Sequence, residues 1–141
     1  MPGPALKQLH AHHAIHQGAL TGAIQKTDEV KRLLKAGEDE VAKMAADHLL
    51  EYWETRIIAH ADAEEDGFYQ EMVGLHPELE SAVSQLTRDH DLLRTIAKDI
   101  KKMLSDHGLT QDVIQQFEAL IVVNDIHSRD EERMLLDEPN R

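Results

Sequence analysis

The sequence contains no cysteine, so neither a disulfide framework nor thiolate ligation of a metal can be part of its design. Any metal site must instead be built from histidine, carboxylate, tyrosine or water, which suits harder metals than a zinc finger holds. Basic residues are also scarce, with 15 against 27 acidic ones and a formal net charge of -12. Because such a chain repels phosphate, we expect neither nucleic acid nor an anionic membrane surface among its partners.

Long apolar runs are absent as well. No stretch approaches the roughly 20 apolar residues that a membrane-spanning helix needs. The first residues, Met1-Pro2-Gly3-Pro4, lack the charged segment and apolar run of a signal peptide. We therefore expect a cytoplasmic protein without a membrane segment. A length of 141 residues is that of one domain, and we expect residues 1–141 to share a single core.

Glycine and proline are few and are grouped at a small number of points, while helix-forming residues dominate everywhere else. This pattern predicts an all-α chain of four helices. The first ends at a left-handed glycine cap, Gly37, and the second runs from about residue 39 past residue 60. Pro77 opens the third helix, and Thr110 caps the start of the fourth, just after Gly108. Short connections between long helices predict an up-down-up-down antiparallel four-helix bundle.

Ten histidines are several times what a globular protein of this size usually carries, and two of them begin copies of one motif. The pattern His-x-x-x-Glu-Glu starts at His60 and again at His127. Residues four apart on a helix differ by about 40° in direction and one turn in height, so His60 with Glu64, and His127 with Glu131, can each reach one shared point. Both motifs lie on the apolar face of their helices. Two such points inside one bundle predict a dinuclear metal site.

The distances of the histidines from the predicted turns indicate that further histidines lie at this site. With the third turn centred between Gly108 and Leu109, His90 and His127 are equally far from it, so an antiparallel pairing places them opposite each other. The same construction at the first turn places His60 opposite position 15, between His13 and His16. Both lie on the predicted apolar seam of the first helix, and His12 shares a face with His16. The predicted metal ligands are His13, His16, His60, Glu64, His90, His127 and Glu131, with the choice among His12, His13 and His16 left open.

Imidazole and carboxylate without thiolate suit iron or manganese better than a closed, four-coordinate structural zinc site. The two glutamates can bridge two ions, and a position that the protein leaves free can take water, dioxygen, peroxide or nitric oxide. Chance burial does not explain the pattern, because a buried glutamate without a partner costs several kcal/mol. Tyr52 and Tyr69 stay open between binding a ferric ion and reaching water from a helix end.

The order of these residues resembles the hemerythrin-like family, whose pattern is one histidine, then His-x-x-x-Glu, then one histidine, then His-x-x-x-Glu. The resemblance spans nearly the whole chain. It implies a centre of two iron ions with oxo or hydroxo and carboxylate bridges. It also implies a function in binding dioxygen, sensing oxygen or redox state, handling nitric oxide, or disposing of peroxide.

Two departures from the oxygen-carrying members bear on the choice among these functions. Those members have a second histidine one turn from the histidine of the third helix, where this chain has Leu86 and Arg94. Their last carboxylate is an aspartate five residues after the histidine, whereas Glu131 follows His127 by four. Both departures argue against reversible oxygen carriage. We therefore expect a protein that binds or reacts with peroxide or small gaseous ligands, and a peroxide-decomposing activity is one form that this reaction can take. The alternative is an iron- or oxygen-responsive sensor that signals through helix packing, and the sequence indicates no oligomeric state.

Overall fold

The computed structural model describes residues 4–136, and within this range every regular element is helical. The prediction of an all-α chain is therefore confirmed for the described part of the sequence. Two of the elements, η1 and η3, are π-helical, and η2 is a single 3-10 turn. In chain order the elements are α1 (Pro4–Lys35), α2 (Asp39–Tyr52), η1 (Trp53–Ile58), α3 (Ala59–Asp66), α4 (Phe68–Leu75), η2 (Pro77–Leu79), α5 (Glu80–His107), α6 (Gln111–Glu131) and η3 (Glu132–Leu136).

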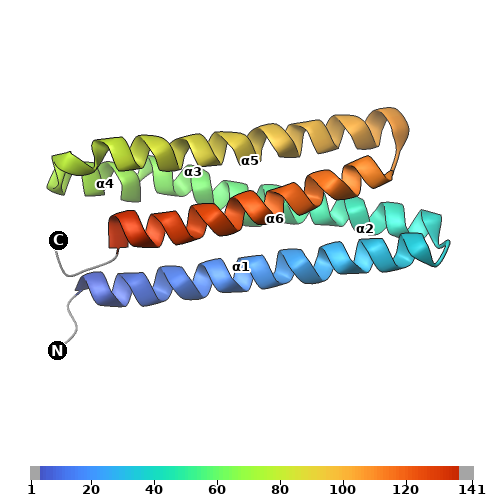
Figure 1. Ribbon diagram of the computed structural model, residues 1–141, viewed down its shortest axis with the longest axis horizontal. Helices are drawn as coiled ribbons and strands as arrows, with labels where there is room; N and C mark the ends of the chain where they lie inside the picture. Colours follow the sequence, from blue (N-terminus) through green and yellow to red (C-terminus); the bar gives the residue numbers. More distant parts are fainter. Residues whose placement is uncertain (1–3, 137–141) are drawn as a thin grey trace.

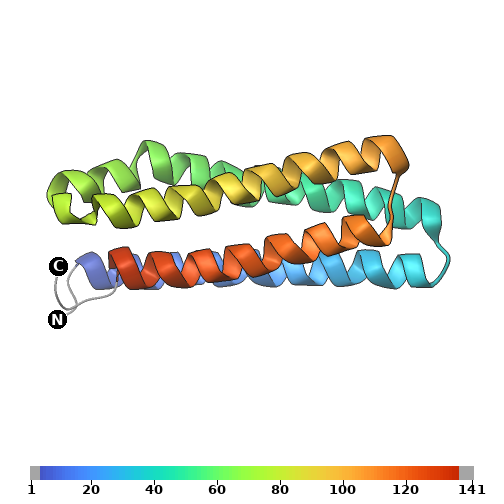
Figure 2. The ribbon, with the colours of Figure 1, turned by 45° about the horizontal axis from the view of Figure 1, so that its top comes forward.

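Four long helical segments lie side by side along one axis (Figure 1). They are α1, the continuous run α2–η1–α3, α5, and α6 with η3. Helix α1 packs against α2 and α6, and α5 packs against α6, so the segments enclose a common interior (Figure 2). The molecule is thus a bundle of four helical segments. No helix within the described range is both long and apolar enough to cross a membrane.

The turn after α1 has the predicted left-handed glycine. Gly37 has a φ of 79°, a region that residues with a Cβ atom rarely adopt. The N–H of Gly37 donates to the carbonyl of Leu34 at 3.1 Å, and the N–H of Glu38 donates to that of Leu33 at 3.0 Å. These bonds satisfy the last carbonyls of the helix and end it at Lys35.

The start of α6 is capped by Thr110, as the sequence predicted. Its hydroxyl accepts a hydrogen bond from the N–H of Val113 at 3.4 Å. Replacing Thr110 with alanine is expected to lower the free energy of unfolding by about 1 kcal/mol, because a helix N–H then loses its acceptor. Urea denaturation at equilibrium measures the effect. Thr21→Ala, an exposed change in the middle of α1, is the control and should not destabilise the protein.

The second helix is less regular than the sequence suggested. The predicted continuous helix past residue 60 contains a π-helical stretch, η1, in which Trp53 and Ile57 both point into the core. The chain then breaks at Gly67, as expected, but a separate short helix, α4, follows before the turn at Pro77. Pro77 opens the 3-10 turn η2, and α5 begins only at Glu80. The extra helix matters because it carries Tyr69 into the interior.

The buried apolar residues form two clusters, separated along the bundle axis. The larger cluster occupies the half of the bundle near the α1–α2 and α5–α6 turns and contains Trp53, Leu93, Ile100, Phe117 and Leu120 among others. The smaller cluster consists of Tyr69, Leu79, Leu86, Leu135 and Leu136. Buried polar residues lie between them, since α5 passes from Leu86 through His90 to Leu93, and α6 passes from Leu120 through His127 and Glu131 to Leu135.

Candidate metal centre

His90 of α5 and His127 of α6 face each other inside the bundle, with their Nε2 atoms 3.0 Å apart. Their residues are only 1% and 3% exposed. A carboxylate oxygen stands beside each ring: Glu64 Oε1 is 3.4 Å from Nε2 of His90, and Glu131 Oε2 is 3.4 Å from Nε2 of His127. One potential ligand atom from each of these four residues lies within 4.8 Å of the others, a spacing compatible with a single metal ion.

A second group of this kind joins α1 to the same two glutamates. Nε2 of His16 is 3.2 Å from Glu131 Oε1, and Nδ1 of His12 is 3.5 Å from the same oxygen. Nδ1 of His12 is also 3.9 Å from Glu64 Oε2. His60 stands on this side too, because its Nε2 is 3.6 Å from Glu64 Oε2 and its ring centre is 6.4 Å from those of both His12 and His16. Three histidines thus surround this second position.

The two glutamates connect the two groups. Glu64 turns Oε1 toward His90 and Oε2 toward His12 and His60, while Glu131 turns Oε2 toward His127 and Oε1 toward α1. Glu64 is 5% exposed and Glu131 is fully buried. Two buried carboxylates that each offer one oxygen to each of two histidine groups have the arrangement required to bridge a pair of ions.

Six buried side-chain nitrogen and oxygen atoms in the described part of the chain lack a hydrogen-bond partner, and all but Nε1 of Trp53 lie at this place. Each such atom costs roughly 1–3 kcal/mol when nothing compensates it. Imidazole nitrogens and carboxylate oxygens are metal-ligating atoms, so this donor set fits a cation. The atoms concerned are Nδ1 of His12, Nδ1 of His16, Nε2 of His60, Oε2 of Glu64 and Oε1 of Glu131.

The pKa values of the two glutamates are shifted in opposite directions, although both side chains are buried. Burial, followed by the repulsion of Glu131, raises the pKa of Glu64 to about 10. Burial also acts to raise the pKa of Glu131, but its close contacts with the rings of His12, His127 and His16 outweigh it and hold that pKa far below its usual range. Two carboxyl groups this close cannot both ionise cheaply, so Glu64 keeps a proton at neutral pH and Glu131 does not. A cation binding between them would displace that proton.

The pKa values of His90 on α5 and His127 on α6 are also shifted in opposite directions. Burial, and then the proximity of His127, lowers the pKa of His90. Burial also disfavours a charged His127, but its hydrogen bonds to Asp89 and Glu131 overcome this and raise the pKa of His127 to about 9. Without a cation, His127 is therefore the protonated member of this pair, next to the ionised Glu131.

Further carboxylates orient these rings from outside the cluster. Nδ1 of His127 lies 3.0 Å from Asp89 Oδ2, and Nδ1 of His90 lies 2.7 Å from Glu65 Oε2. Each bond turns the opposite ring nitrogen, Nε2, toward the cluster. Glu65 is in turn held by the guanidinium of Arg94 at 2.5 Å. Glu65 therefore contacts the far side of the His90 ring and Asp89 that of the His127 ring, and no pattern in the sequence indicates the role of Asp89.

Replacing Asp89 with asparagine is expected to weaken metal binding about 10–100-fold, because the carboxylate that fixes and polarises the His127 ring is lost. Competition with a chromophoric chelator measures the affinity. Asp99→Asn makes the same change at an exposed position on α5 and is the control. Equal affinities in the two variants would contradict an orienting role for Asp89.

The structure brings together six of the predicted ligands: His16, His60, Glu64, His90, His127 and Glu131. His13 lies outside both groups, with a side chain that is 59% exposed and Nδ1 2.8 Å from Glu132 Oε1. His12 stands in its place. The buried face of α1 passes through His16, Ala19 and Ala23, and a face with this direction turns residue 12 inward and residue 13 outward.

The two tyrosines left open by the sequence have different environments. Tyr69, on α4, is 1% exposed; its hydroxyl donates to Glu131 Oε2 and lies 3.5 Å from Nε2 of His90. Its ring stacks on that of His90, with centres 5.5 Å apart and planes 4° from parallel. Burial and the negative Glu131 raise the pKa of Tyr69, so the hydroxyl stays protonated and acts as a donor. Tyr52 instead donates to the carbonyl of Ala19 at 2.8 Å.

Comparison of the chain with protein-family models, with curated proteins and with solved structures gave no match. No relative therefore assigns a role to any of these side chains.

Proposed function

We propose that this chain is a cytoplasmic, hemerythrin-like protein, an up-down-up-down antiparallel bundle that holds two iron ions and binds or reacts with dioxygen, hydrogen peroxide or nitric oxide. The observation that carries the proposal is the sharing of Glu64 and Glu131 between two buried histidine groups. A single ion would need only one such group. The motif order in the sequence and the absence of thiolate donors support iron over a structural zinc.

His12, His16 and His60 would hold one ion, and His90 and His127 the other, with Glu64 and Glu131 spanning both. The His90–His127 side has one histidine fewer, which favours it as the side where an exogenous small molecule finds room. Tyr69 stands on this side, with its hydroxyl directed at Glu131.

Bound iron would supply one-electron redox chemistry between its ferrous and ferric states. The surrounding residues have separate tasks. Glu131, fully buried and ionised, neutralises positive charge at the centre. The hydroxyl of Tyr69 keeps a proton at Glu131 Oε2, within reach of a molecule that needs to be protonated. Burial of His90 and His127 excludes bulk water, which strengthens these interactions.

The sensor remains the second candidate, and one observation favours it. Both His-x-x-x-Glu motifs adjoin a π-helical segment: η1 precedes His60 by two residues, and η3 begins directly after Glu131. Such segments occur often at functional sites and can rewind to α-helix with a small shift in register. Occupancy of the cluster could then be transmitted to the ends of α3 and α6. A sensor should lose helical order without iron, whereas an enzyme should consume peroxide rapidly with iron bound.

The test is metal analysis of gently purified protein, followed by absorption spectra before and after addition of peroxide. We expect two irons per chain and a spectral change on peroxide addition, and the rate of peroxide loss separates turnover from sensing. His60→Ala should lower the iron content, while His48→Ala, on the exposed face of α2, should not. Protein that contains no iron, or a His60→Ala variant that keeps both ions, would contradict the proposal.

A further inference from the structure

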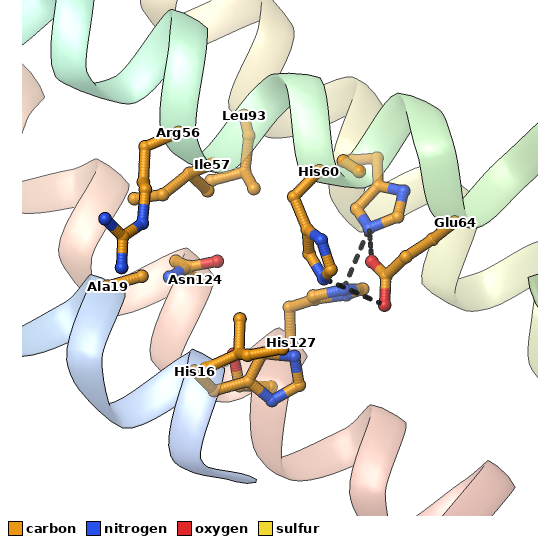
Figure 3. A pocket seen from close by; sticks show the side chains of 13 residues that line it. His16, Ala19, Arg56, Ile57, His60, Glu64, Leu93, Asn124 and His127 are labelled. Atoms are coloured by element: carbon orange, nitrogen blue, oxygen red, sulfur yellow. Dashed lines mark hydrogen bonds and ion pairs between the residues drawn. The ribbon is translucent and has the colours of Figure 1, made fainter. Parts of the chain in front are cut away.

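A cavity of about 260 Å³ adjoins the histidine cluster on the side of the larger apolar cluster (Figure 3). An engineered apolar cavity of roughly 150 Å³ can hold benzene, so this volume exceeds what a diatomic gas or peroxide needs. His16, His60, Glu64, His90 and His127 form one end of it. Whatever fills the cavity therefore meets the proposed metal pair directly.

The cavity arises because small or polar residues occupy the layer next to the histidines. Ala19 stands three residues after His16 on α1, and Asn124 stands three residues before His127 on α6. Ile57 and Leu93 supply apolar walls from η1 and α5. A large apolar residue at either of the first two positions would have filled the space.

Asn124 is an unusual occupant of this layer. It is only 6% exposed, its amide borders the cavity, and no hydrogen bond of its side chain is present among the residues that the structure describes. In Figure 3 it lies on the wall opposite His60 and Glu64. The nitrogen and oxygen of this amide are not among the buried unpartnered atoms, because they are open to the cavity, where they can form hydrogen bonds with the molecule that occupies it.

Arg56 adds a positive charge at the end of the cavity where Asn124 lies (Figure 3). It is exposed, lines the cavity, and has no ion-pair partner within the described range, in contrast to Arg94 and Arg133, which are paired with carboxylates. The spacing of Arg56, His60 and Glu64 by four residues places all three along one side of the cavity. A free guanidinium is the natural partner for a carboxylate.

We propose that the cavity binds a short dicarboxylate. One carboxylate pairs with Arg56 and accepts a hydrogen bond from Asn124, the methylene chain lies against Ile57 and Leu93, and the other carboxylate faces the metal pair. The cavity is polar at both ends and apolar between them, which matches a molecule with two charged ends. This inference rests on the proposed function, because the second carboxylate needs the positive charge of the ions.

Isothermal titration calorimetry of the iron-loaded protein with glutarate measures the binding affinity and tests the proposal. We expect binding that is at least tenfold tighter than for butyrate, which has the same apolar chain but a single carboxylate. Arg56→Gln should weaken glutarate binding at least tenfold, since a charge-assisted hydrogen bond is lost. Arg32→Gln, the same change near the far end of α1, is the control and should bind glutarate like the unmodified protein.

Asn124→Leu gives a second, independent readout. It should abolish glutarate binding and at the same time raise the melting temperature by about 2–4 °C, because an unpartnered amide is replaced by an apolar group. A lower melting temperature would mean that Asn124 is needed for the fold, and would overturn its role as a ligand contact.

Iron is measured in the same samples. Two irons without glutarate binding, or binding that Arg56→Gln leaves unchanged, would overturn the inference while the proposed function stands. Absence of iron would overturn the proposed function, and the inference with it.

Discussion

Glu131→Gln is expected to reduce the metal content from the proposed two ions per chain to fewer than about 0.2, because binding at both positions weakens by about two orders of magnitude or more. Glu131 is fully buried, and its two oxygens face the two histidine groups separately. Glutamine has no charge to offset the cations, and its NH₂ group would point at one of the histidines. Plasma emission spectrometry after gel filtration gives the metal content.

A variant that fails to fold would also contain no metal, so a second substitution is needed. Glu64→Gln serves this purpose, because the pKa of Glu64 is about 10 and the metal-free protein therefore already carries a neutral side chain there. It should keep the helical circular dichroism spectrum of the unmodified protein and still lose its metal. Glu118→Gln, exposed on the same helix as Glu131, is the control. Full occupancy in Glu64→Gln would mean that Glu64 is not a ligand.

Removal of the metal by a chelator is expected to lower the melting temperature by about 8–16 °C. A ligand that binds only the folded state at a free concentration of about 1,000 times its dissociation constant stabilises that state by roughly 4 kcal/mol. For a domain of this length, each kcal/mol corresponds to about 2–4 °C. The loss is expected to be large because the cluster contains unpartnered buried atoms, including Nε2 of His60 and Oε1 of Glu131. Differential scanning calorimetry before and after chelation measures it.

Adding iron back should restore the original melting temperature, which separates metal loss from irreversible damage. The same chelation applied to Glu131→Gln should change its melting temperature by less than about 2 °C. Equal melting temperatures for the untreated and chelated forms of the unmodified protein would show that the cluster is satisfied without a cation.

The sequence predicted the site best where regular helical geometry governs it. His90 and His127 are equally far from the α5–α6 turn, and this alone placed their rings opposite each other in a pair of straight antiparallel helices. The spacing of four residues likewise brought each motif histidine toward its own glutamate. The helix ends at Gly37 and Thr110 were predictable because they depend on local backbone chemistry.

Features that depend on small rotations or irregular segments were not predictable in this way. His12 and His13 point in directions about 100° apart, so a modest error in the phase of α1 exchanged them. Tyr69 enters the cluster through α4, a short helix whose direction no periodicity specifies. Asp89 looked like any solvated acidic residue, because its role depends on contact with His127 across the bundle.

The histidines and glutamates lie between the two buried apolar clusters, so a bound metal would hold together two halves of the bundle with cores of unequal size. The smaller half, which includes Leu79, Leu86 and Leu136, has too few buried side chains to resist local opening without help. Hydrogen–deuterium exchange should therefore be uniformly slow with metal bound. After chelation, amides of α4 and the start of α5 should exchange far faster, while those around Trp53 and Phe117 keep their protection. Bound ions would thus suppress local opening of the half of the bundle that contains the smaller apolar cluster.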